Sequence, residues 1–283
     1  MAELLLGAPV AAAIREELKE RVHALLSRGL TPRLALARVG DRANDRYYEA
    51  SVRRFCETVG VQTEGFVLPD GCTREALAGT LRQISARSEL HGCLLQRPLP
   101  ADLADFEVYD ALCPEKDLDG MTSASLGALF SGKPGAFAPC TADAVLALLR
   151  HYDIDPAGKH AVVIGRSLVI GRPVAQLLLG ADATVTVCHR RTPELPALCR
   201  QADILVSAAG RPGLVGAECL RPGQIVIDVG TTAEGGVLMG DVELAAAESV
   251  AAAVTPVPGG VGAVTTALLL RHLIEAAERS LKE

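Results

Sequence analysis

The sequence lacks tryptophan, and only 3% of its 283 residues are aromatic. It also lacks a long basic run, and its formal net charge is −6. Because nucleic acids and anionic membrane surfaces attract basic patches, this charge balance argues against both as partners. No apolar run reaches the roughly 18 residues that predict a transmembrane helix, so we expect a soluble protein without a membrane span.

The eight cysteines include no Cys-x-x-Cys pair and lie mostly within apolar stretches. Such spacing is typical of neither a zinc site nor a disulfide framework. We therefore expect reduced core cysteines, a cytoplasmic protein and no bound metal ion. The N-terminus has no basic region before its apolar residues, so it does not match a signal peptide, and Pro9 fits the first turn of a helix instead.

The sequence does contain a regular alternation of strand and helix patterns. In the first part, helices are predicted over 9–26, 44–59, 74–86 and 102–112, and strands over 34–39, 61–68 and 92–96. In the second part, strands are predicted over 161–165, 183–189, 203–208 and 224–230, with helices between the first three and at 141–151 and 263–281. This alternation predicts an α/β fold with parallel sheets covered on both faces, and the length suggests two domains.

Two segments between these elements carry polar or small residues. Residues 114–120 form a charged segment that is predicted to be a loop too polar for the core. Residues 126–138 are rich in glycine and small side chains, which is typical of a boundary between domains. Thr141 then matches the N-cap of the helix that follows.

The segment His160–Pro173 is predicted to form a buried strand, a glycine turn and the start of a helix. Backbone N–H groups and the helix dipole at such a turn favour a nucleotide phosphate. The spacing differs from the dinucleotide fingerprint G-x-G-x-x-G, because Gly165 and Gly171 are one residue further apart and Ser167 replaces the middle glycine. A strand-turn-helix that binds no ligand is the alternative interpretation.

The next strand ends about 20 residues after the glycine turn, where an NAD-binding fold places an acidic residue. This sequence has His189, Arg190 and Arg191 there. A carboxylate would repel the 2′-phosphate of NADP, whereas guanidinium groups bind it. We therefore predict NADP as the cofactor, with Arg166 contributing from the turn; solvated arginines at a strand end are the alternative.

Eight motifs then occur in a specific order along the chain. They are Tyr48–Ser51, Gln96–Pro100, Pro114–Gly120, Pro139–Thr141, the turn from Gly165 to Pro173, Ile227–Gly230, Gly240–Val242 and Thr255–Gly262. In this order they resemble the bifunctional methylenetetrahydrofolate dehydrogenase/methenyltetrahydrofolate cyclohydrolase family, over essentially the whole chain.

The resemblance implies both a fold and a reaction. It implies an N-terminal α/β folate-binding domain over residues 1–138, completed by a helix over 263–283, and a Rossmann-type, doubly wound NADP domain over 139–262. The two domains would face each other across a cleft, in a homodimer. The implied reaction moves a hydride from 5,10-methylenetetrahydrofolate to NADP, after which water adds to the methenyl product to give 10-formyltetrahydrofolate.

The resemblance also assigns roles to single residues. It places Tyr48 against the folate ring, Gln96 beside the one-carbon unit and Asp119 on the pterin, roles that an aromatic face, an amide and a carboxylate can fill. Each alone would also suit an ordinary helix tyrosine, strand-end amide or loop charge. Close backbone approach to the substrate is implied at Pro258, Gly259, Gly260 and Gly262. The implied cofactor residues are Thr141, Gly165, Arg166, Ser167, Gly171, His189, Arg190, Arg191, Gly230 and Thr231.

The sequence departs from the family pattern four residues after Tyr48. The family has its catalytic lysine there, one helical turn from the tyrosine, and this sequence has Val52. Arg53 and Arg54 are predicted to point off that face, and arginine is a poor base because it stays protonated. Smaller departures are Ser125, in place of asparagine, and 263–264, where alanine and valine replace proline and methionine.

These observations leave three functional interpretations. The first is a dehydrogenase that has lost its cyclohydrolase activity, because hydride transfer needs positioning whereas water addition needs proton transfer. A fully bifunctional enzyme that uses another base is an alternative to it. The second is a non-catalytic protein that binds folate and NADP, against which the retained Gln96 and Asp119 argue. The third is another NADP dehydrogenase of similar fold, such as one that acts on shikimate.

Overall fold

The computed structural model describes residues 1–235 and 237–281. The chain divides into two compact units, which are described separately. The three-stranded unit comprises Ala13–Cys140 and the chain from Thr266 onward, and the six-stranded unit comprises Met1–Ala12 and Thr141–Thr265. The sequence prediction begins the first domain at residue 1, whereas the first twelve residues belong to the six-stranded unit because their strand pairs with its sheet.

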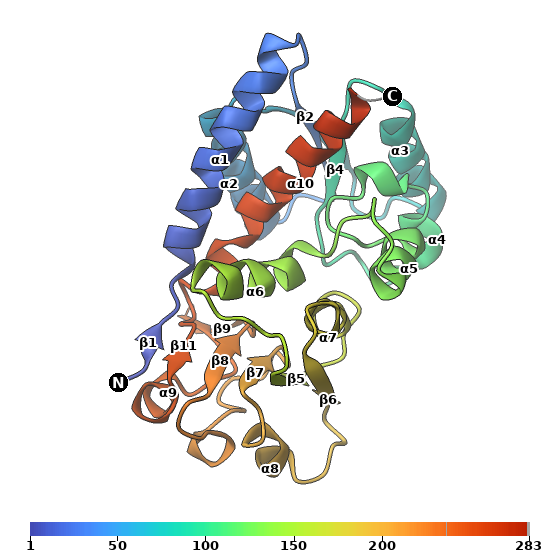
Figure 1. Ribbon diagram of the computed structural model, residues 1–283. Coiled ribbons are helices and arrows are strands. Elements are labelled where there is room, and N and C mark those ends of the chain that lie inside the picture. Colours follow the sequence, from blue (N-terminus) through green and yellow to red (C-terminus); the bar gives the residue numbers. More distant parts are fainter. Residues whose placement is uncertain (236, 282–283) are drawn as a thin grey trace. The chain divides into compact units, whose positions relative to one another are not determined.

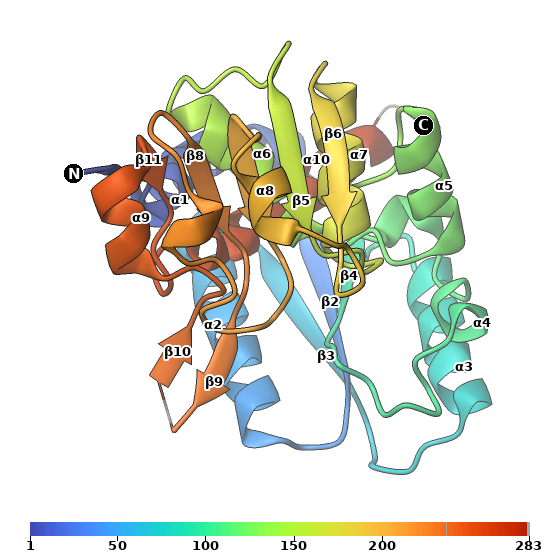
Figure 2. The same ribbon diagram turned by 90° about the horizontal axis from the view of Figure 1, so that it is seen from below.

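The sheet of the three-stranded unit is parallel, as predicted. In the described chain its strand order is β3 (Gln62–Leu68), β2 (Arg33–Val39) and β4 (Gly92–Leu95), and Figure 2 shows the three strands side by side. Leu34 at the start of β2 lies opposite Thr63 in β3 and Gly92 in β4. The parallel arrangement brings the carboxyl ends of all three strands to one edge, which is where open α/β sheets bind ligands.

The core of this unit follows from the helical periodicity of α3 (Arg74–Ala86). The Thr73 side chain accepts the Ala76 N–H at 3.2 Å and so caps the first turn. Leu77, Leu81 and Ile84 recur at spacings of four and three and are fully buried among residues of β2 and β4. Each such side chain contributes about 1.5–3 kcal/mol through burial.

Helices from both ends of the chain complete this unit. α1 (Gly7–Ser27) begins in the six-stranded unit and continues here, where α2 (Ala43–Val59) also lies, and α10 (Thr265–Ser280) ends the described chain. Arg21 of α1 donates to the Glu278 carboxylate of α10 at 2.9 and 2.8 Å, so that these two helices lie against each other (Figure 1). The bidentate geometry makes this one of the stronger kinds of ion pair.

Three sequence predictions in this unit were wrong in part. The helix predicted over 102–112 is only α4 (Phe106–Tyr109), because Asp105 starts it by accepting the Glu107 N–H at 2.9 Å. The presumed boundary over 126–138 is entered by α5 (Ser123–Ser131), which the Thr122 side chain caps. The charged segment 114–120 contains a 3₁₀ turn and two fully buried residues, Asp117 and Leu118.

Asp117 can be buried because both of its carboxylate oxygens accept backbone hydrogen bonds. One oxygen accepts the Met121 N–H at 3.0 Å, and the other accepts the Thr122 N–H at 2.8 Å. Backbone donors thus replace the water that the carboxylate would otherwise lose. Polarity in the sequence therefore did not indicate exposure in this segment.

The six-stranded unit contains a parallel sheet of Rossmann type. Its strand order in the described chain is β1 (Glu3–Leu4), β11 (Ala253–Val254), β8 (Ile225–Asp228), β7 (Ile204–Ser207), β5 (His160–Ile164) and β6 (Thr184–Cys188). The chain proceeds from β5 to β6 on one side and returns to β7 on the other. The strand order therefore reverses between β5 and β7, at the kind of switch point where doubly wound sheets bind nucleotides.

Helices and short elements surround this sheet. They are α6 (Cys140–His151), α7 (Gly171–Gly180), α8 (Leu195–Cys199) and α9 (Leu244–Val250), with a β9 (Thr232–Glu234) and β10 (Val237–Met239) hairpin. α9, the hairpin and the two-residue strands were not predicted. The helix of residues 140–151 starts at Cys140, so Thr141 is its second residue instead of its N-cap. No helix in the described residues is long and apolar enough to cross a membrane.

Candidate functional site

The turn after β5 requires glycine at two positions. Gly165 has φ +126°, and a Cβ there would overlap the carbonyl oxygen of Ala208 in the loop after β7. A Cβ at Gly171 would overlap the backbone of Gly165 itself. The first glycine thus lets two loops meet, and the second lets α7 start directly against the turn.

Ser167 organises the start of α7. Its Oγ accepts the N–H groups of Ile170 at 3.1 Å and Gly171 at 3.4 Å, while its carbonyl accepts the Arg172 N–H at 3.0 Å. Two of the helix N–H groups that the sequence analysis expected to be open to a phosphate are therefore already paired. An anion at this turn relies more on the guanidinium groups around it.

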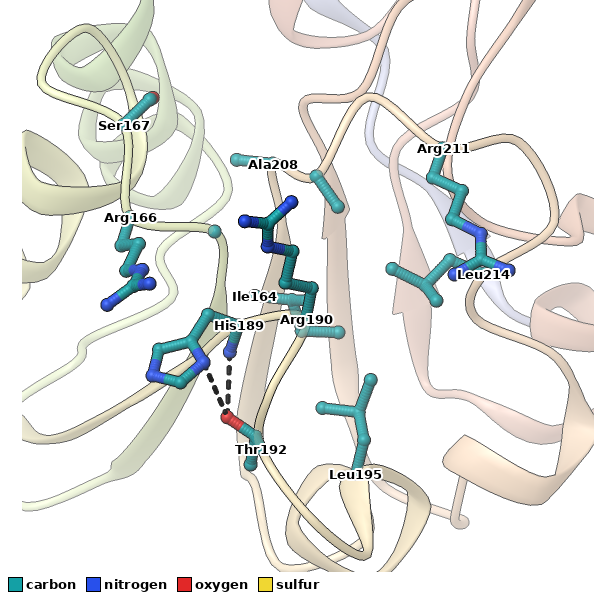
Figure 3. A pocket seen from close by; sticks show the side chains of 12 residues that line it. Ile164, Arg166, Ser167, His189, Arg190, Thr192, Leu195, Ala208, Arg211 and Leu214 are labelled. Atoms are coloured by element: carbon teal, nitrogen blue, oxygen red, sulfur yellow. Dashed lines mark hydrogen bonds between the residues drawn. The ribbon is translucent and has the colours of Figure 1, made fainter.

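A cavity of about 380 Å³ opens at the carboxyl ends of β5, β6 and β7 (Figure 3). Its lining residues are Ile164, Gly165, Arg166, Ser167, His189, Arg190, Thr192, Leu195, Ala208, Ala209, Arg211 and Leu214. Half of the predicted cofactor residues are among them, namely Gly165, Arg166, Ser167, His189 and Arg190. The others do not line it; they are Thr141, Gly171, Arg191, Gly230 and Thr231. We name this cavity the arginine pocket.

Three arginines from three separate loops line the arginine pocket. Arg166 follows β5, Arg190 follows β6 and Arg211 follows β7 (Figure 3). Guanidinium groups bind phosphate with paired hydrogen bonds, so the set suits the phosphates of a dinucleotide. Arg211 was not predicted from the sequence. Its place in the lining depends on β7 lying next to β5 in the sheet, which the sequence alone does not show.

The loop after β6 is held by its own hydrogen bonds. Thr192 Oγ1 accepts the His189 N–H at 2.8 Å, and His189 Nδ1 accepts the Arg191 N–H at 3.2 Å. Both side chains are exposed, but the turn places Arg190 in the pocket lining and Arg191 outside it. The two adjacent arginines are therefore not equivalent.

Asp241 shapes the loop that carries Arg211. Its Oδ2 accepts the Ser207 hydroxyl at 2.9 Å and the Ala209 N–H at 2.7 Å, and its Oδ1 accepts the Arg211 N–H at 2.6 Å. A Cβ at Gly230 would overlap this carboxylate. Packing against Asp241 thus requires glycine at position 230, whose predicted role in cofactor binding stays a prediction.

Asp228 forms a second buried carboxylate beside it. Oδ1 accepts the N–H groups of Gly230 at 2.9 Å and Asp241 at 3.0 Å, and Oδ2 accepts that of Val242 at 2.9 Å. A Cβ at Gly240 would overlap this carboxylate in turn. Burial raises the pKa of Asp228 to about 6, although the backbone donors oppose that rise.

Replacing Asp228 by asparagine should destabilise the protein. The amide nitrogen would face a backbone N–H, so we expect a loss of about 1–3 kcal/mol at neutral pH. Because the folded-state pKa of the aspartate is raised, the folded wild-type protein binds a proton more readily than the unfolded chain. The free energy of unfolding of the wild-type protein should therefore exceed that of the Asp228→Asn variant by a margin that grows by up to about 3 kcal/mol as the pH falls from 6 to 4.

Denaturant unfolding of both proteins across this pH range measures the effect. Glu243→Gln is the matched control, because Glu243 is an exposed carboxylate in the same unit. A wild-type advantage over Asp228→Asn that stays constant with pH would contradict the raised pKa.

In the three-stranded unit, the structure brings Tyr48 and Asp119 together. One Asp119 oxygen pairs with the Arg97 guanidinium, and the other accepts the Cys140 N–H at 3.0 Å. The pKa of the Tyr48 hydroxyl is raised, first by burial and then by the nearby Asp119 charge. The tyrosine side chain itself is 39% exposed. A flat ring and a held carboxylate thus lie in one cluster, and their roles toward the folate stay predictions.

Gln96 lies at the carboxyl end of β4 and is 4% exposed. Its Nε2 is 3.5 Å from Oε2 of Glu49, one residue after Tyr48 in α2. Arg38 and Arg53 also donate to Glu49, at 3.0 and 2.7 Å. The sequence analysis missed Glu49, because nothing in a single sequence shows that α2 brings it to the end of β4.

Val52 is fully buried in α2. It forms one stripe with Cys56 and Val59, at spacings of four and three, and shares that helix face with Tyr48. Arg53 donates to Glu49 and to Thr63 Oγ1. The stripe is apolar from position 52 onward.

Two further sequence-predicted features have structural roles. Ser125, the position where the family usually has asparagine, is buried, and its Oγ accepts the Thr122 hydroxyl at 2.9 Å in the cap of α5. Residues 258–262 lie in the six-stranded unit, where the Gly259 carbonyl accepts the Gly7 N–H at 2.8 Å. Gly259 has φ +102°, which favours glycine.

No group of three His, Cys, Asp or Glu among the described residues is placed to hold a metal ion.

Comparison with known proteins identifies the family. Residues 5–119 match the catalytic-domain model of the tetrahydrofolate dehydrogenase/cyclohydrolase family, and residues 139–281 match its NAD(P)-binding-domain model. The chain belongs to this family. The predicted family, fold class, dehydrogenase class and NADP cofactor are thereby confirmed, whereas the roles of single residues stay predictions.

Full-length relatives agree with this assignment. The bifunctional protein FolD of Carboxydothermus hydrogenoformans is 45% identical over 281 residues, which are 98% of each chain. The bifunctional FolD structure from Campylobacter jejuni has a TM-score of 0.96 and 37% identity, and covers 99% of each chain. The Trypanosoma brucei enzyme, described as complexed with NADP cofactor and inhibitor, has a TM-score of 0.93 and 37% identity, with 100% of this chain and 99% of that one covered.

Proposed function

We propose that this protein is an NADP-dependent 5,10-methylenetetrahydrofolate dehydrogenase whose cyclohydrolase activity is lost or very weak. One observation supports the second part above all. Val52, the position of the family's catalytic lysine by resemblance, is a fully buried apolar residue on the same helix face as Tyr48. Valine transfers no proton, and general acid–base help accounts for about 10²–10⁴-fold in rate.

Lys116 does not replace the missing base. It lies in the segment 114–120 beside Asp117, but its ammonium donates to the carbonyl oxygens of Ile84, Ser85 and Arg87 at 3.1, 2.8 and 2.7 Å. Partial burial lowers its pKa, yet those three carbonyl acceptors occupy its three protons. Its role is to join the segment to the end of α3.

The arginine pocket fits the predicted cofactor. Gly165 lets the turn after β5 meet the loop after β7, and Arg166, Arg190 and Arg211 offer guanidinium groups for phosphates. NADP, when bound there, supplies the nicotinamide ring that accepts a hydride. The residues of this chain bind and orient it, and Arg190 is the candidate partner for its 2′-phosphate.

The Tyr48 and Asp119 cluster serves the substrate in this proposal. Tyr48 presents a partly exposed ring for stacking, and Asp119 keeps lone pairs beyond those used by Arg97 and the Cys140 N–H. Retention of this cluster together with Gln96 supports an enzyme over a protein that only binds its ligands. Positioning of this kind is the main requirement of hydride transfer.

The decisive assay follows NADPH and the methenyl compound together. With 5,10-methylenetetrahydrofolate and NADP, the purified protein should reduce NADP while 5,10-methenyltetrahydrofolate accumulates and hydrolyses no faster than in buffer. Enzyme-dependent hydrolysis would reject the loss of cyclohydrolase activity and favour a bifunctional enzyme with another base. Absence of both reactions would favour a non-catalytic protein.

Replacing Asp119 by alanine should impair the reaction with the folate substrate but not the binding of NADP. Loss of the carboxylate should reduce turnover of methylenetetrahydrofolate by about a hundredfold or more, because charge-assisted hydrogen bonds to the pterin disappear. NADP affinity should stay within about twofold, since the arginine pocket lies in the other unit. Steady-state kinetics and titration with NADP measure the two effects, and an equal loss of both would indicate a folding role for Asp119.

The resemblance also suggests the assembly and the location. We propose a homodimer in the cytoplasm, as the family relationship implies. Tetrahydrofolate one-carbon derivatives are its proposed small-molecule partners. Sedimentation of the purified protein measures the oligomeric state directly.

A further inference from the structure

The Glu49 carboxylate is held in a fixed position beside Gln96. Arg38 Nε donates to its Oε2 at 3.0 Å, and Arg53 Nη2 donates to its Oε1 at 2.7 Å. Its side chain is 12% exposed, as is that of Arg38. Two guanidinium groups and low exposure fix the side-chain rotamer, so its contact with Gln96 is part of a built arrangement.

This carboxylate determines which end of the Gln96 amide faces it. A carboxylate paired with guanidinium groups only accepts hydrogen bonds, so the amide nitrogen turns toward it and the amide oxygen would be repelled. The amide oxygen, Gln96 Oε1, therefore points away from Glu49. It is buried, and no donor among residues 1–235 and 237–281 reaches it. A buried acceptor in this state is complemented by a ligand that donates a hydrogen bond or carries positive charge.

We infer that Glu49 is a positioning residue that fixes the Gln96 amide with its oxygen toward the folate one-carbon unit, which favours the cationic methenyl form over neutral folates. This inference rests on the proposed function, because it takes Gln96 to lie beside that unit. It deepens the proposal by naming the charge state of folate that the site prefers.

The chemistry of the oxidation gives this orientation its effect. A C–H bond of the methylene bridge breaks, and the hydrogen leaves with both electrons to the nicotinamide. The folate is oxidised, NADP is reduced, and positive charge remains on the bridge carbon and its two nitrogens. An amide oxygen oriented in advance toward that charge stabilises the transition state as well as the methenyl product.

A lysine at position 52 would impose a different arrangement. An ammonium group only donates, so beside Gln96 it would take the amide oxygen as its acceptor. In this chain Val52 offers no donor, and Glu49 takes the amide nitrogen instead. The same glutamine then presents its oxygen to the substrate.

Guanidinium groups compensate the charge of Glu49, so its influence on the substrate passes through the Gln96 amide. Arg38 also pairs with Asp41 at 2.9 Å, and Arg53 also donates to Thr63 Oγ1 at 2.7 Å. Asp41 also pairs with Arg46, so three guanidinium groups face two carboxylates and the Glu49 charge is compensated. A long-range field from Glu49 is therefore small, and the orientation of Gln96 carries the effect.

Two substitutions at position 49 test the inference. Glu49→Gln removes the charge that forces the amide orientation, and Glu49→Asp keeps the charge between the arginines but withdraws it from Gln96 by one methylene group. Affinities for 5,10-methenyltetrahydrofolate and for tetrahydrofolate are measured by titration without cofactor. Both variants should bind the methenyl compound about tenfold more weakly, the effect of one hydrogen bond, with the tetrahydrofolate affinity within about twofold.

Kinetics and a control variant complete the experiment. In both variants kcat for methylenetetrahydrofolate oxidation should fall about tenfold with KM nearly unchanged, because the interaction strengthens as charge develops. Glu57→Gln is the control, because Glu57 is an exposed carboxylate on the same helix. It should change neither affinity.

The outcomes separate this inference from the proposed function. An unchanged ratio of the two affinities in Glu49→Asp would overturn the role of Glu49, and so would an equal weakening of both folates together with a lower melting temperature, which indicates a structural role. Failure of the wild-type protein to bind either folate would overturn the proposed function, and this inference with it.

Discussion

A Val52→Lys variant should hydrolyse 5,10-methenyltetrahydrofolate faster than the wild-type protein, by as much as the 10²–10⁴-fold that general acid–base help provides. The wild-type protein should match the rate in buffer. The reason is that lysine introduces a titratable amine on the helix face shared with Tyr48. Partial desolvation there shifts a lysine toward its neutral, basic form. The rate is measured from the decrease over time in the absorbance of 5,10-methenyltetrahydrofolate.

The burial of position 52 and the nearby Glu49 carboxylate both affect a lysine introduced there. Val52 is fully buried, so the lysine side chain must extend along the helix to place its amine, which reduces stability. Glu49 precedes position 52 by three residues and can pair with the new ammonium, which keeps it protonated. Adding Glu49→Gln should therefore increase hydrolysis further.

Val52→Met is the matched control, because it adds similar length without an amine. It should leave hydrolysis at the buffer rate. An equal gain in Val52→Met would show that a change of shape, and not proton transfer, limits the reaction.

An Arg190→Asp variant should bind NADP about a hundredfold more weakly, because a charge-assisted phosphate contact is replaced by repulsion. Affinity for NAD should change by no more than about threefold, since NAD lacks the 2′-phosphate. Arg191→Asp makes the same change of charge one residue away, at a side chain outside the lining of the arginine pocket. It should affect NADP far less.

Titration of the three proteins with each dinucleotide measures these differences. If Arg190→Asp and Arg191→Asp weakened NADP binding equally, then net charge, and not a contact from Arg190, would determine the preference for NADP over NAD. If the wild-type protein reduced NAD as efficiently as NADP, the assignment of Arg190 to the 2′-phosphate would be wrong.

Local signals in the sequence predicted much of the fold. The helix over 74–86 was predicted within its observed bounds, because its cap and its apolar periodicity both lie within one short segment. The turn at Gly165 was also evident, since a buried strand and two glycines determine it. Both features depend on neighbours close in sequence, which is why a single sequence sufficed.

Features that depend on distant partners could not be predicted. Asp117 appeared as a loop charge because the N–H groups that accommodate it are arranged by a turn that the sequence does not show. Glu49 and Gln96 are 47 residues apart and meet only because β2 and β4 are adjacent in the sheet. Arg211 reaches the pocket because β7 neighbours β5, which is a matter of strand order.

Two buried carboxylates of the six-stranded unit, those of Asp228 and Asp241, constrain how this chain can diverge. A side chain at Gly230 would overlap Asp241, and a side chain at Gly240 would overlap Asp228. Shortening either aspartate to make room would leave several backbone N–H groups without an acceptor. No single substitution at these four positions is therefore neutral, and an evolutionary path between alternatives must cross a less stable intermediate. Each glycine can change only together with the aspartate it contacts, so Gly230 and Asp241 should be inherited together, and so should Gly240 and Asp228.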